Sequence, residues 1–353
     1  MKENSIKKAI SGKIILITGG TGSFGNSVVS KLIEYNPKQI IIFSRDEKKQ
    51  FDMRNRFEDN KKLRFVIGDV RDRVSLSKIM PGVDYVFHAA ALKQVPTCEF
   101  FPMEAIRTNS LGAENVISVA IDHKVQTVVV LSTDKAVYPI NVIGMTKALM
   151  EKIMISEAKN LNGTKSKTVL CGVRYGNVLY TRGSVIPFFI KLMKAGKKIP
   201  VTHFTMTRFL LPLNEAVSLV LFALVDGRSG SIYVKKSPAC TLETLAKALC
   251  ELFEYKKGYY EVGIRAGEKI HETLVAEEEF VRAKDLGGYY EIPPESQSLD
   301  YDRYFSIGIK PEKKDSLPFT SENTTQLNLA QVKKLLLTIP EVKKELTMFK
   351  NHS

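Results

Sequence analysis

The residues best suited to chemistry are three consecutive ones, Thr133, Asp134 and Lys135, and a second lysine further along, Lys147. In a tyrosine-x-x-x-lysine motif, the lysine lowers the pKa of the tyrosine, which then takes a proton from the alcohol being oxidised. Lys147 occupies the lysine position of such a motif, but Ile143 stands in place of the tyrosine and cannot accept a proton. The chain is therefore not expected to be a simple alcohol dehydrogenase.

An acid next to an amine suits the elimination of water. Once a sugar is oxidised at C4, a base can remove its acidic C5 proton while an acid protonates the departing C6 hydroxyl. Asp134 and Lys135 offer these groups at the end of an apolar run, 128–131, where open α/β sheets place their chemistry. Lys135 can be the base only if its neutral form is accessible, through burial or neighbouring cations. The alternative is a surface ion pair at a strand end, and we favour chemistry.

A glycine-rich segment follows the first apolar run and opens a helix. Gly19 allows a tight turn, Gly22 lets the backbone approach a pyrophosphate, and Gly25 lets the helix pack closely on the strand. Free N–H groups at the helix N-terminus then face the phosphates. Because the required strand and helix are both present, we expect a dinucleotide site rather than a structural turn. The cofactor contacts expected here are Gly19, Thr21, Gly22, Ser23, Phe24 and Gly25.

The end of the second strand selects the cofactor. An NAD site usually has an acidic residue there for the ribose 2′-hydroxyl, whereas this chain has Ser44, followed by Arg45 and Lys48. A small hydroxyl beside two cations favours the 2′-phosphate of NADP. NAD stays open as the alternative because Asp46 and Glu47 are interleaved with the cations. Further expected contacts are Asp69 and Val70 beside the adenine, Ala89, Ala90 and Lys93 along the ribose and phosphates, and Lys147 at the nicotinamide ribose.

These residues need a sheet to position them. Short apolar runs alternate with amphipathic segments in the first half of the chain, which predicts an α/β fold with a doubly wound parallel sheet, a Rossmann fold. We expect an NADP-binding domain over 1–175 and a smaller, mainly substrate-binding region over 176–353. The expected strands are 14–17, 40–43, 85–87 and 128–131, and the expected helices are 26–35, 145–158, 216–225 and 329–337.

Composition narrows the class of protein. No apolar run is long enough to cross a bilayer, and the N-terminus lacks the apolar stretch of a signal peptide, so we expect a cytoplasmic protein without a membrane partner. The four cysteines lack the spacing of metal ligands, so no metal is expected. The net charge of +14 is spread along the chain rather than interleaved with aromatics, which favours anionic small molecules over nucleic acid.

Several segments together give the chain a family resemblance over nearly its whole length. They are 16–25, 43–50, 67–72, 86–96, 131–136, 174–178, 182–187 and 263–269. The chain resembles the inverting UDP-N-acetylglucosamine 4,6-dehydratases of the extended short-chain dehydrogenase family, the CapE- and CapD-like polysaccharide biosynthesis proteins of capsule and O-antigen synthesis. The resemblance implies a redox-neutral reaction in which NADP stays bound.

The resemblance also implies residue roles. Asp134 would protonate the leaving hydroxyl, Lys135 would remove the C5 proton, and Thr133 would hydrogen-bond near C4. Reprotonation of C5 from the opposite face would give a UDP-linked 4-keto-6-deoxy-L-sugar. Arg182 and Arg265 suit a doubly charged pyrophosphate, although either can be a surface arginine. The implied UDP-sugar contacts are Lys93, Asn177, Arg182, Arg265 and Glu268.

The chain departs from the usual pattern at Ile143, where close relatives that also lack the tyrosine carry methionine. What replaces the phenol is open: Tyr138, the nearest phenol in sequence, is either a substitute base or a packing residue.

Relatives assemble as hexamers, so we expect a homo-oligomer, with 272–302 as a candidate latch from a neighbouring subunit. The competing functions are a UDP-sugar 4-epimerase acting on UDP-glucose or UDP-N-acetylglucosamine, and a non-catalytic sensor of NADP or UDP-sugar.

Overall fold

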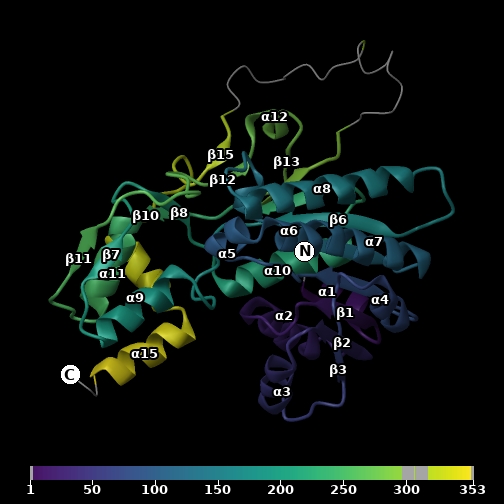
Figure 1. Cartoon of the computed structure of the whole chain (residues 1–353), viewed down its shortest axis with the longest axis horizontal. Coiled ribbons are helices and arrows are strands. Elements are labelled where there is room, and N and C mark those ends of the chain that lie inside the picture. Colours follow the sequence, from purple (N-terminus) through teal and green to yellow (C-terminus); the bar gives the residue numbers. More distant parts are fainter. Residues whose placement is uncertain (1–2, 296–305, 307–316, 351–353) are drawn as a thin grey trace.

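A nine-stranded sheet forms the centre of the protein in the computed structural model, which describes residues 3–295, 306 and 317–350 (Figure 1). The strand order is β13-β14-β9-β6-β5-β4-β1-β2-β3; β14 pairs antiparallel with both β13 and β9, and all other neighbouring pairs are parallel. This confirms the predicted doubly wound parallel sheet. The strands are β1 (Ile14–Thr18), β2 (Gln39–Ser44), β3 (Leu63–Ile67), β4 (Tyr85–His88), β5 (Thr127–Leu131), β6 (Val169–Arg174), β9 (Ile232–Lys235), β13 (Lys284–Asp285) and β14 (Tyr289–Ile292).

Helices cover both faces of this sheet, which is why its strands are apolar on both sides. Leu16 of β1 packs in the core on one face, whereas Ile15 and Ile17 pack in the core on the other. The first face carries α4 (Arg73–Ile79), α7 (Gly112–Asp122) and α8 (Val142–Asn160), and the second carries α1 (Glu3–Ile10), α2 (Ser23–Glu34) and α10 (Leu213–Asp226). Among the described residues, no helix has both the length and the apolar character needed to cross a membrane.

A smaller region with its own core lies at the side of the sheet (left in Figure 1). Phe189, Leu245 and Val332 meet in that core, and two short strand pairs frame it, β7 with β11 and β8 with β10. Its elements are α9 (Val185–Lys194), β7 (Ile199–Val201), β8 (Thr207–Phe209), β10 (Ala239–Thr241), α11 (Leu242–Leu252), β11 (Tyr259–Glu261), α14 (Leu329–Leu336) and α15 (Pro340–Lys350).

The chain passes between the two parts more than once, so a single boundary at residue 175 does not follow its path. After β8 in the smaller region, α10 packs on the large sheet and β9 pairs in parallel with β6. The reason is that the parallel sheet continues past β6 through another crossover helix. The predicted helices lie within or overlap α2, α8, α10 and α14.

The candidate latch segment packs against its own chain as far as it is described. β12 (Thr273–Val275) pairs with β15 (Phe319–Thr320), and α12 (Glu277–Phe280) leads into β13 and β14 of the large sheet. Residues 296–302 of the predicted latch lie outside the described residues.

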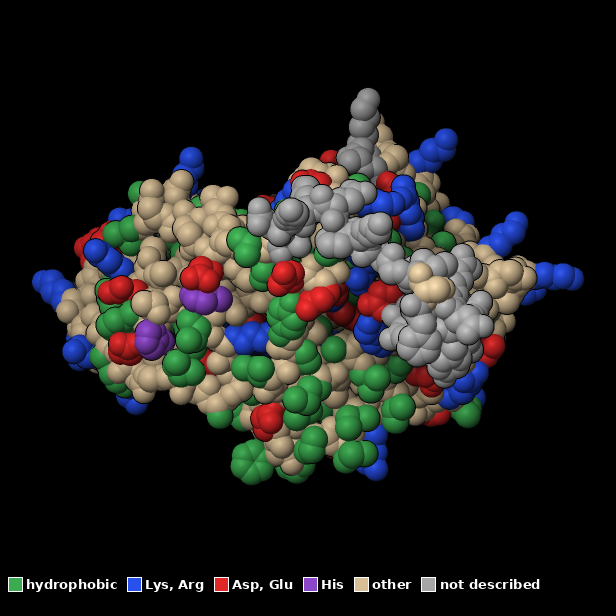
Figure 2. All heavy atoms as spheres, turned by 90° about the horizontal axis from the view of Figure 1, so that it is seen from above, with side chains coloured by type: hydrophobic (Ala, Val, Ile, Leu, Met, Phe, Trp, Pro, Cys, Tyr) green, Lys and Arg blue, Asp and Glu red, His purple; other side chains and the backbone are tan. Residues whose placement is uncertain are grey.

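One face of the molecule leaves large apolar side chains in solvent. It is formed by α5 (Val95–Phe100), α6 (Pro102–Ala105), the π-helical turn η1 (Ile106–Leu111) and the start of α8, which contact one another. Hydrophobic side chains gather along the lower edge of the view in Figure 2. We call the following residues the exposed apolar face: Phe100, Phe101, Met103, Leu111, Met145 and Leu149.

Candidate active site

The turn after β1 forms a cradle of the kind that a dinucleotide pyrophosphate requires. Gly19 has a φ of 67°, and a Cβ there would lie 2.7 Å from the Ala90 Cα. A Cβ on Gly25 would collide with the Gly20 carbonyl, so only glycine lets α2 begin this close to β1. At Gly22, in contrast, a Cβ would meet only the Gly19 carbonyl oxygen at 3.6 Å, so the space before the α2 N-terminus is open. The backbone therefore fits a bound pyrophosphate.

A cavity of about 430 Å³ lies beyond the carboxyl ends of β1, β2 and β3. Predicted cofactor residues from separate segments line this cavity, because the carboxyl ends of parallel strands meet at one edge of the sheet. The lining residues are Gly19, Thr21, Phe43, Ser44, Arg45, Asp46, Lys49, Gly68, Asp69, Val70, Ala90, Ala91 and Thr108. Phe24 and Lys48 are predicted contacts outside this lining: the Phe24 ring packs against Phe87 and Tyr175, and Lys48 lies 3.7 Å from Asp52.

The end of the cavity at β2 combines hydroxyls with cations. The Ser44 Oγ lies 3.1 Å from the Thr21 Oγ1 and accepts a hydrogen bond from the Asp46 backbone N–H. Arg45 is half-exposed, with its Nη1 3.3 Å from the Asp69 Oδ2. The Asp46 carboxylate caps α3 (Glu47–Arg56) and is paired with Lys49, so its charge is neutralised locally. Lys49, rather than the predicted Lys48, is the lysine at this cavity.

The three predicted catalytic residues form one hydrogen-bonded cluster directly after β5. Thr133 caps the 3-10 turn η2 (Asp134–Ala136) and donates a hydrogen bond of 2.7 Å to the Asp134 Oδ1. The same oxygen accepts a hydrogen bond of 3.1 Å from the Lys135 Nζ. Asp134 is only 1% exposed, and its Oδ2 has no hydrogen-bond partner among the described residues. The pair is therefore not the surface ion pair of the alternative interpretation.

The charge state of Lys135 differs from what a free base needs. Burial lowers the pKa of its ammonium group, but the carboxylates of Asp134 and Glu272 outweigh burial and raise the pKa above its usual value. The Lys135 Nζ lies 3.6 Å from the Glu272 Oε1. Neighbouring cations therefore do not supply the neutral amine, and the nearest acceptor for its proton is Asp134.

Lys147 lies beside this cluster. It is buried on α8 and donates a hydrogen bond of 2.7 Å to the carbonyl oxygen of Leu131, the last residue of β5. Burial lowers the pKa of Lys147 to about 8.

At the end of the adjacent β4, His88 is fully buried with its Nδ1 2.8 Å from the Thr18 Oγ1, and burial lowers the pKa of His88 to about 3. His88 is therefore a neutral core residue.

Neither Ile143, at the tyrosine position, nor Tyr138, the nearest phenol in sequence, offers a free phenol to the cluster among the described residues. Ile143 is buried in a small apolar group with Cys98 and Ala105. Tyr138 has a positive φ of 46° and donates its hydroxyl hydrogen to the Glu278 carboxylate at 2.7 Å, while that hydroxyl accepts from the backbone of α12. These contacts tie the Tyr138 hydroxyl to the start of α12.

The turn at residues 181–184 brings substrate and cofactor residues together. The Lys93 Nζ donates to the Arg182 carbonyl oxygen at 3.1 Å, and the Arg182 N–H donates to the Ser23 Oγ at 3.2 Å. Burial and the Arg182 charge lower the pKa of Lys93. The Asn177 Oδ1 is buried without a hydrogen-bond partner among the described residues. Two predicted substrate contacts, Lys93 and Arg182, thus meet the predicted cofactor contact Ser23 at the α2 N-terminus.

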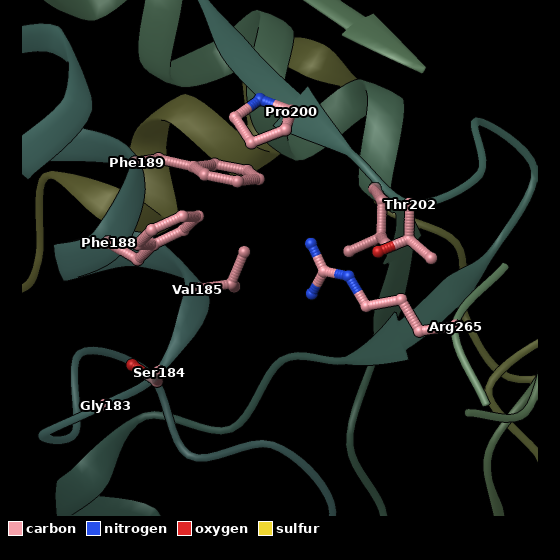
Figure 3. A pocket seen from close by; sticks show the side chains of 9 residues that line it. Gly183, Ser184, Val185, Phe188, Phe189, Pro200, Thr202 and Arg265 are labelled. Carbon is pink, nitrogen blue, oxygen red and sulfur yellow. The ribbon is translucent and has the colours of Figure 1, made fainter. Parts of the chain in front are cut away.

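Arg265 points into a second cavity, of about 290 Å³ (Figure 3). The Arg265 Nη1 lies 3.7 Å from the Glu268 Oε1, so these two predicted substrate contacts lie close together. Apolar side chains of α9, with Pro200, form the opposite wall (Figure 3). The lining consists of Gly183, Ser184, Val185, Phe188, Phe189, Pro200, Thr202, Leu242 and Arg265. A flat apolar wall opposite a cation suits a ligand with both a ring and a phosphate.

Comparison with known proteins identifies the family. Residues 15–294 match the family described as polysaccharide biosynthesis protein, and residues 296–343 match its C-terminal family. The chain belongs to the polysaccharide biosynthesis protein family.

Several known proteins are similar to this chain in sequence, in structure or in both. The UDP-glucose 4-epimerase of Rickettsia prowazekii is 56% identical over 340 residues, which cover 95% of this chain and 98% of that protein. Among solved structures, Pen from Bacillus thuringiensis is 34% identical with a TM-score of 0.85, covering 94% of this chain and 99% of that one. DesIV, a dTDP-glucose 4,6-dehydratase from Streptomyces venezuelae solved with NAD, is 18% identical with a TM-score of 0.66, covering 93% and 99%; it shares the fold.

Sequence reasoning missed part of the site in this family member. Lys49 follows a predicted contact directly, and helical spacing from Arg45 would have found it. Thr108 enters the cofactor cavity from η1, Glu272 reaches Lys135 from the segment before β12, and Arg208 of the smaller region lies beside Glu272. No local pattern marks these three, because each comes from a segment distant in sequence.

Proposed function

We propose that the protein is a UDP-N-acetylglucosamine 4,6-dehydratase that also inverts C5, yielding a UDP-linked 4-keto-6-deoxy-L-sugar for capsule or O-antigen polysaccharide. The Asp134–Lys135 pair carries this proposal. It is an acid–amine pair held at 3.1 Å, and the buried Asp134 Oδ2, which has no hydrogen-bond partner in the described part of the chain, is available to a substrate hydroxyl. Elimination of water needs such a pair, whereas moving a hydride at C4 alone does not.

The proton steps balance within the pair. The Lys135 ammonium first passes a proton to Asp134, which leaves a neutral amine and a carboxylic acid. Lys135 then removes the C5 proton, the C5–H electron pair forms the C5–C6 double bond, and the C6–O bond breaks as Asp134 protonates the departing hydroxyl to water. The pair thereby returns to its starting charges without a proton from solvent. Outside this pair, the C4 hydroxyl would release its proton to solvent as C4 is oxidised, and solvent would return one proton to C5 on the face opposite the sugar's original hydrogen, so that water is the only by-product.

NADP is the cofactor that we propose. The glycine turn after β1 would hold its pyrophosphate, Lys147 its nicotinamide ribose, and Ser44, Arg45 and Lys49 its 2′-phosphate. When bound, the nicotinamide would accept a hydride from C4 and return it to C6. The absence of a carboxylate at Ser44 and the pairing of Asp46 with Lys49 support NADP over NAD.

The substrate would lie between the two cavities. Lys93 and Arg182 at the α2 N-terminus, and Arg265 from the second cavity, supply positive charge for the UDP pyrophosphate. The Asn177 Oδ1, which lacks a hydrogen-bond partner in the part of the chain that the structure describes, and Glu268, beside Arg265, offer acceptors for sugar or ribose hydroxyls. The sugar would then reach Thr133, Asp134 and Lys135 with its C4 to C6 edge.

UDP-glucose 4-epimerase is the second candidate, because the Rickettsia relatives at 55–56% identity carry that name. In such an enzyme C4 is oxidised and then reduced from the other face, without loss of water. Asp134 and Lys135 would then be largely dispensable.

Incubation with UDP-N-acetylglucosamine in D2O, followed by mass spectrometry and proton NMR, separates the candidates. We expect loss of one water, deuterium at C5, and ring couplings that report inversion. A product of unchanged mass with an inverted C4 would identify an epimerase, tested in parallel with UDP-glucose. No turnover in a protein that retains its cofactor would favour a sensor and contradict both enzymes.

A further inference from the structure

A second carboxylate contacts Lys135 from a segment distant in sequence. Glu272 stands just before β12, and its side chain is 4% exposed. Its Oε1 lies 3.6 Å from the Lys135 Nζ and 3.7 Å from the Arg208 Nε. Its Oε2 has no hydrogen-bond partner among the described residues. A buried carboxylate is costly unless cations or donors compensate it, so this placement needs an explanation.

The backbone holds Glu272 firmly. Its N–H donates to the Ser321 Oγ at 2.8 Å, and the Ser321 N–H donates to the Glu272 carbonyl oxygen at 2.8 Å. Arg208, which flanks the carboxylate, is itself fixed by donation to the carbonyl oxygens of Thr207 and Ile270. The Glu272 carboxylate therefore has little freedom to turn away from Lys135.

The charges around Glu272 make a row that runs from the smaller region to the sheet. Arg208 of β8, Glu272, Lys135 and Asp134 alternate in sign along it, and Lys269 adds a further cation. Burial and the Asp134 charge raise the pKa of Glu272, while the three cations oppose them. Lys135 is the only member of the row that lies between two carboxylates within 4 Å, among the described residues.

We propose that Glu272 is a positioning residue for the Asp134–Lys135 pair: its carboxylate holds the Lys135 ammonium against Asp134 and keeps the shared proton on the pair until substrate binds. The inference rests on the proposed dehydratase function. A single carboxylate would leave the lysine chain free to rotate toward solvent, since a quarter of it is exposed. With Glu272 as a second contact, the amine stays at the same place when its proton passes to Asp134, and so faces C5.

The test measures the protonation of Lys135 without substrate, in the full-length protein with bound cofactor. Acetic anhydride acetylates only neutral amines, so the pH dependence of labelling at Lys135, read by peptide mass spectrometry, reports its protonation. Exposed Lys8 serves as the internal reference. In the wild type we expect Lys135 to become reactive at higher pH than Lys8.

Glu272→Gln keeps the shape and removes the charge. We expect labelling of Lys135 at pH 9 to rise on the order of tenfold, since one pKa unit changes the neutral fraction tenfold. Glu272→Asp, which keeps the charge, and Glu322→Gln, which removes an exposed carboxylate nearby, should both follow the wild type. A purely structural role would not produce this division between the Gln and Asp variants.

A folded Glu272→Gln protein with the wild-type labelling profile would overturn the inference. If that variant does not fold, the wild-type profile decides, because a Lys135 that reacts at or below the pH of Lys8 would overturn it as well. Labelling is independent of turnover, so a protein that fails to dehydrate UDP-N-acetylglucosamine yet shows the expected labelling contradicts the proposed function and not the charge arrangement. In an active enzyme, Glu272→Gln should lower kcat more than it changes KM.

Discussion

In the proposed elimination, Lys135 removes a proton from C5 and Asp134 gives one to the departing C6 hydroxyl. Removing either group should therefore stop elimination while leaving cofactor binding intact. We expect Asp134→Asn and Lys135→Met to lower the dehydration rate about 100- to 10,000-fold, the usual contribution of general acid–base groups. Lys152→Met, an exposed lysine of α8, is the matched control and should keep wild-type activity. The rate of keto-sugar formation, measured on protein with confirmed bound NADP, checks this. Full activity in either variant would exclude the proton mechanism.

The cations at the end of β2 should decide between NADP and NAD. Arg45→Ala and Lys49→Ala are expected to weaken NADP binding about tenfold to a hundredfold, since hydrogen bonds to charged groups contribute roughly 1.5–3 kcal/mol. Lys49→Ala also frees the Asp46 carboxylate, which would repel the 2′-phosphate. Lys48→Ala should have a smaller effect, because Lys48 lies outside the cavity beside Asp52. Calorimetric titration with both cofactors measures these affinities, and tighter binding of NAD to the wild type would contradict the assignment.

At the level of elements, a buried ion network holds α12 against the sheet. Arg174, at the end of β6 and 1% exposed, donates to both Glu151 of α8 and Glu279 of α12, at 2.6–3.0 Å. Arg174→Met would leave the buried carboxylate of Glu151 and the partly buried one of Glu279 without this cation, which costs about 3–5 kcal/mol. We expect a clear fall in Tm and faster hydrogen exchange over residues 272–282. Lys152→Met, which breaks an exposed pair with Glu295, should cost only about 0–1 kcal/mol. Equal Tm values for the two variants would contradict this role.

The elements themselves were largely predictable, because the signals are local. The apolar runs at 14–17 and 128–131 lie within β1 and β5, and the glycines between β1 and α2 have the conformation that their spacing predicts. Contacts between distant segments were not predictable in this way. Glu272 reaches Lys135 only because β12 pairs with β15, and residues 213–235 rejoin the large sheet only because β9 pairs with β6. Neither pairing leaves a periodic pattern in the sequence.

At the level of the whole molecule, the exposed apolar face favours self-association. Phe100 is 83% exposed and Phe101 60%, and Met145 and Leu149 lie one helical turn apart on the same side of α8. Contiguous apolar patches on a protein surface usually mark an interaction site. Because a symmetric dimer brings the same patch of two copies together, two helical faces of this kind can cover each other. We therefore predict a homo-oligomer that uses this face.

The double variant Met145→Glu, Leu149→Glu places two like charges in that contact and should shift the protein toward smaller species. Light scattering coupled to size-exclusion chromatography measures the change in mass, with Leu337→Glu, directly after α14 in the smaller region, as the control. Both substituted side chains are about half exposed in one chain, so the monomer should fold and keep its Tm. An unchanged mass in the double variant would place the interface elsewhere. A wild-type monomer at micromolar concentration would contradict the prediction altogether, since the exposed apolar face would then remain in water.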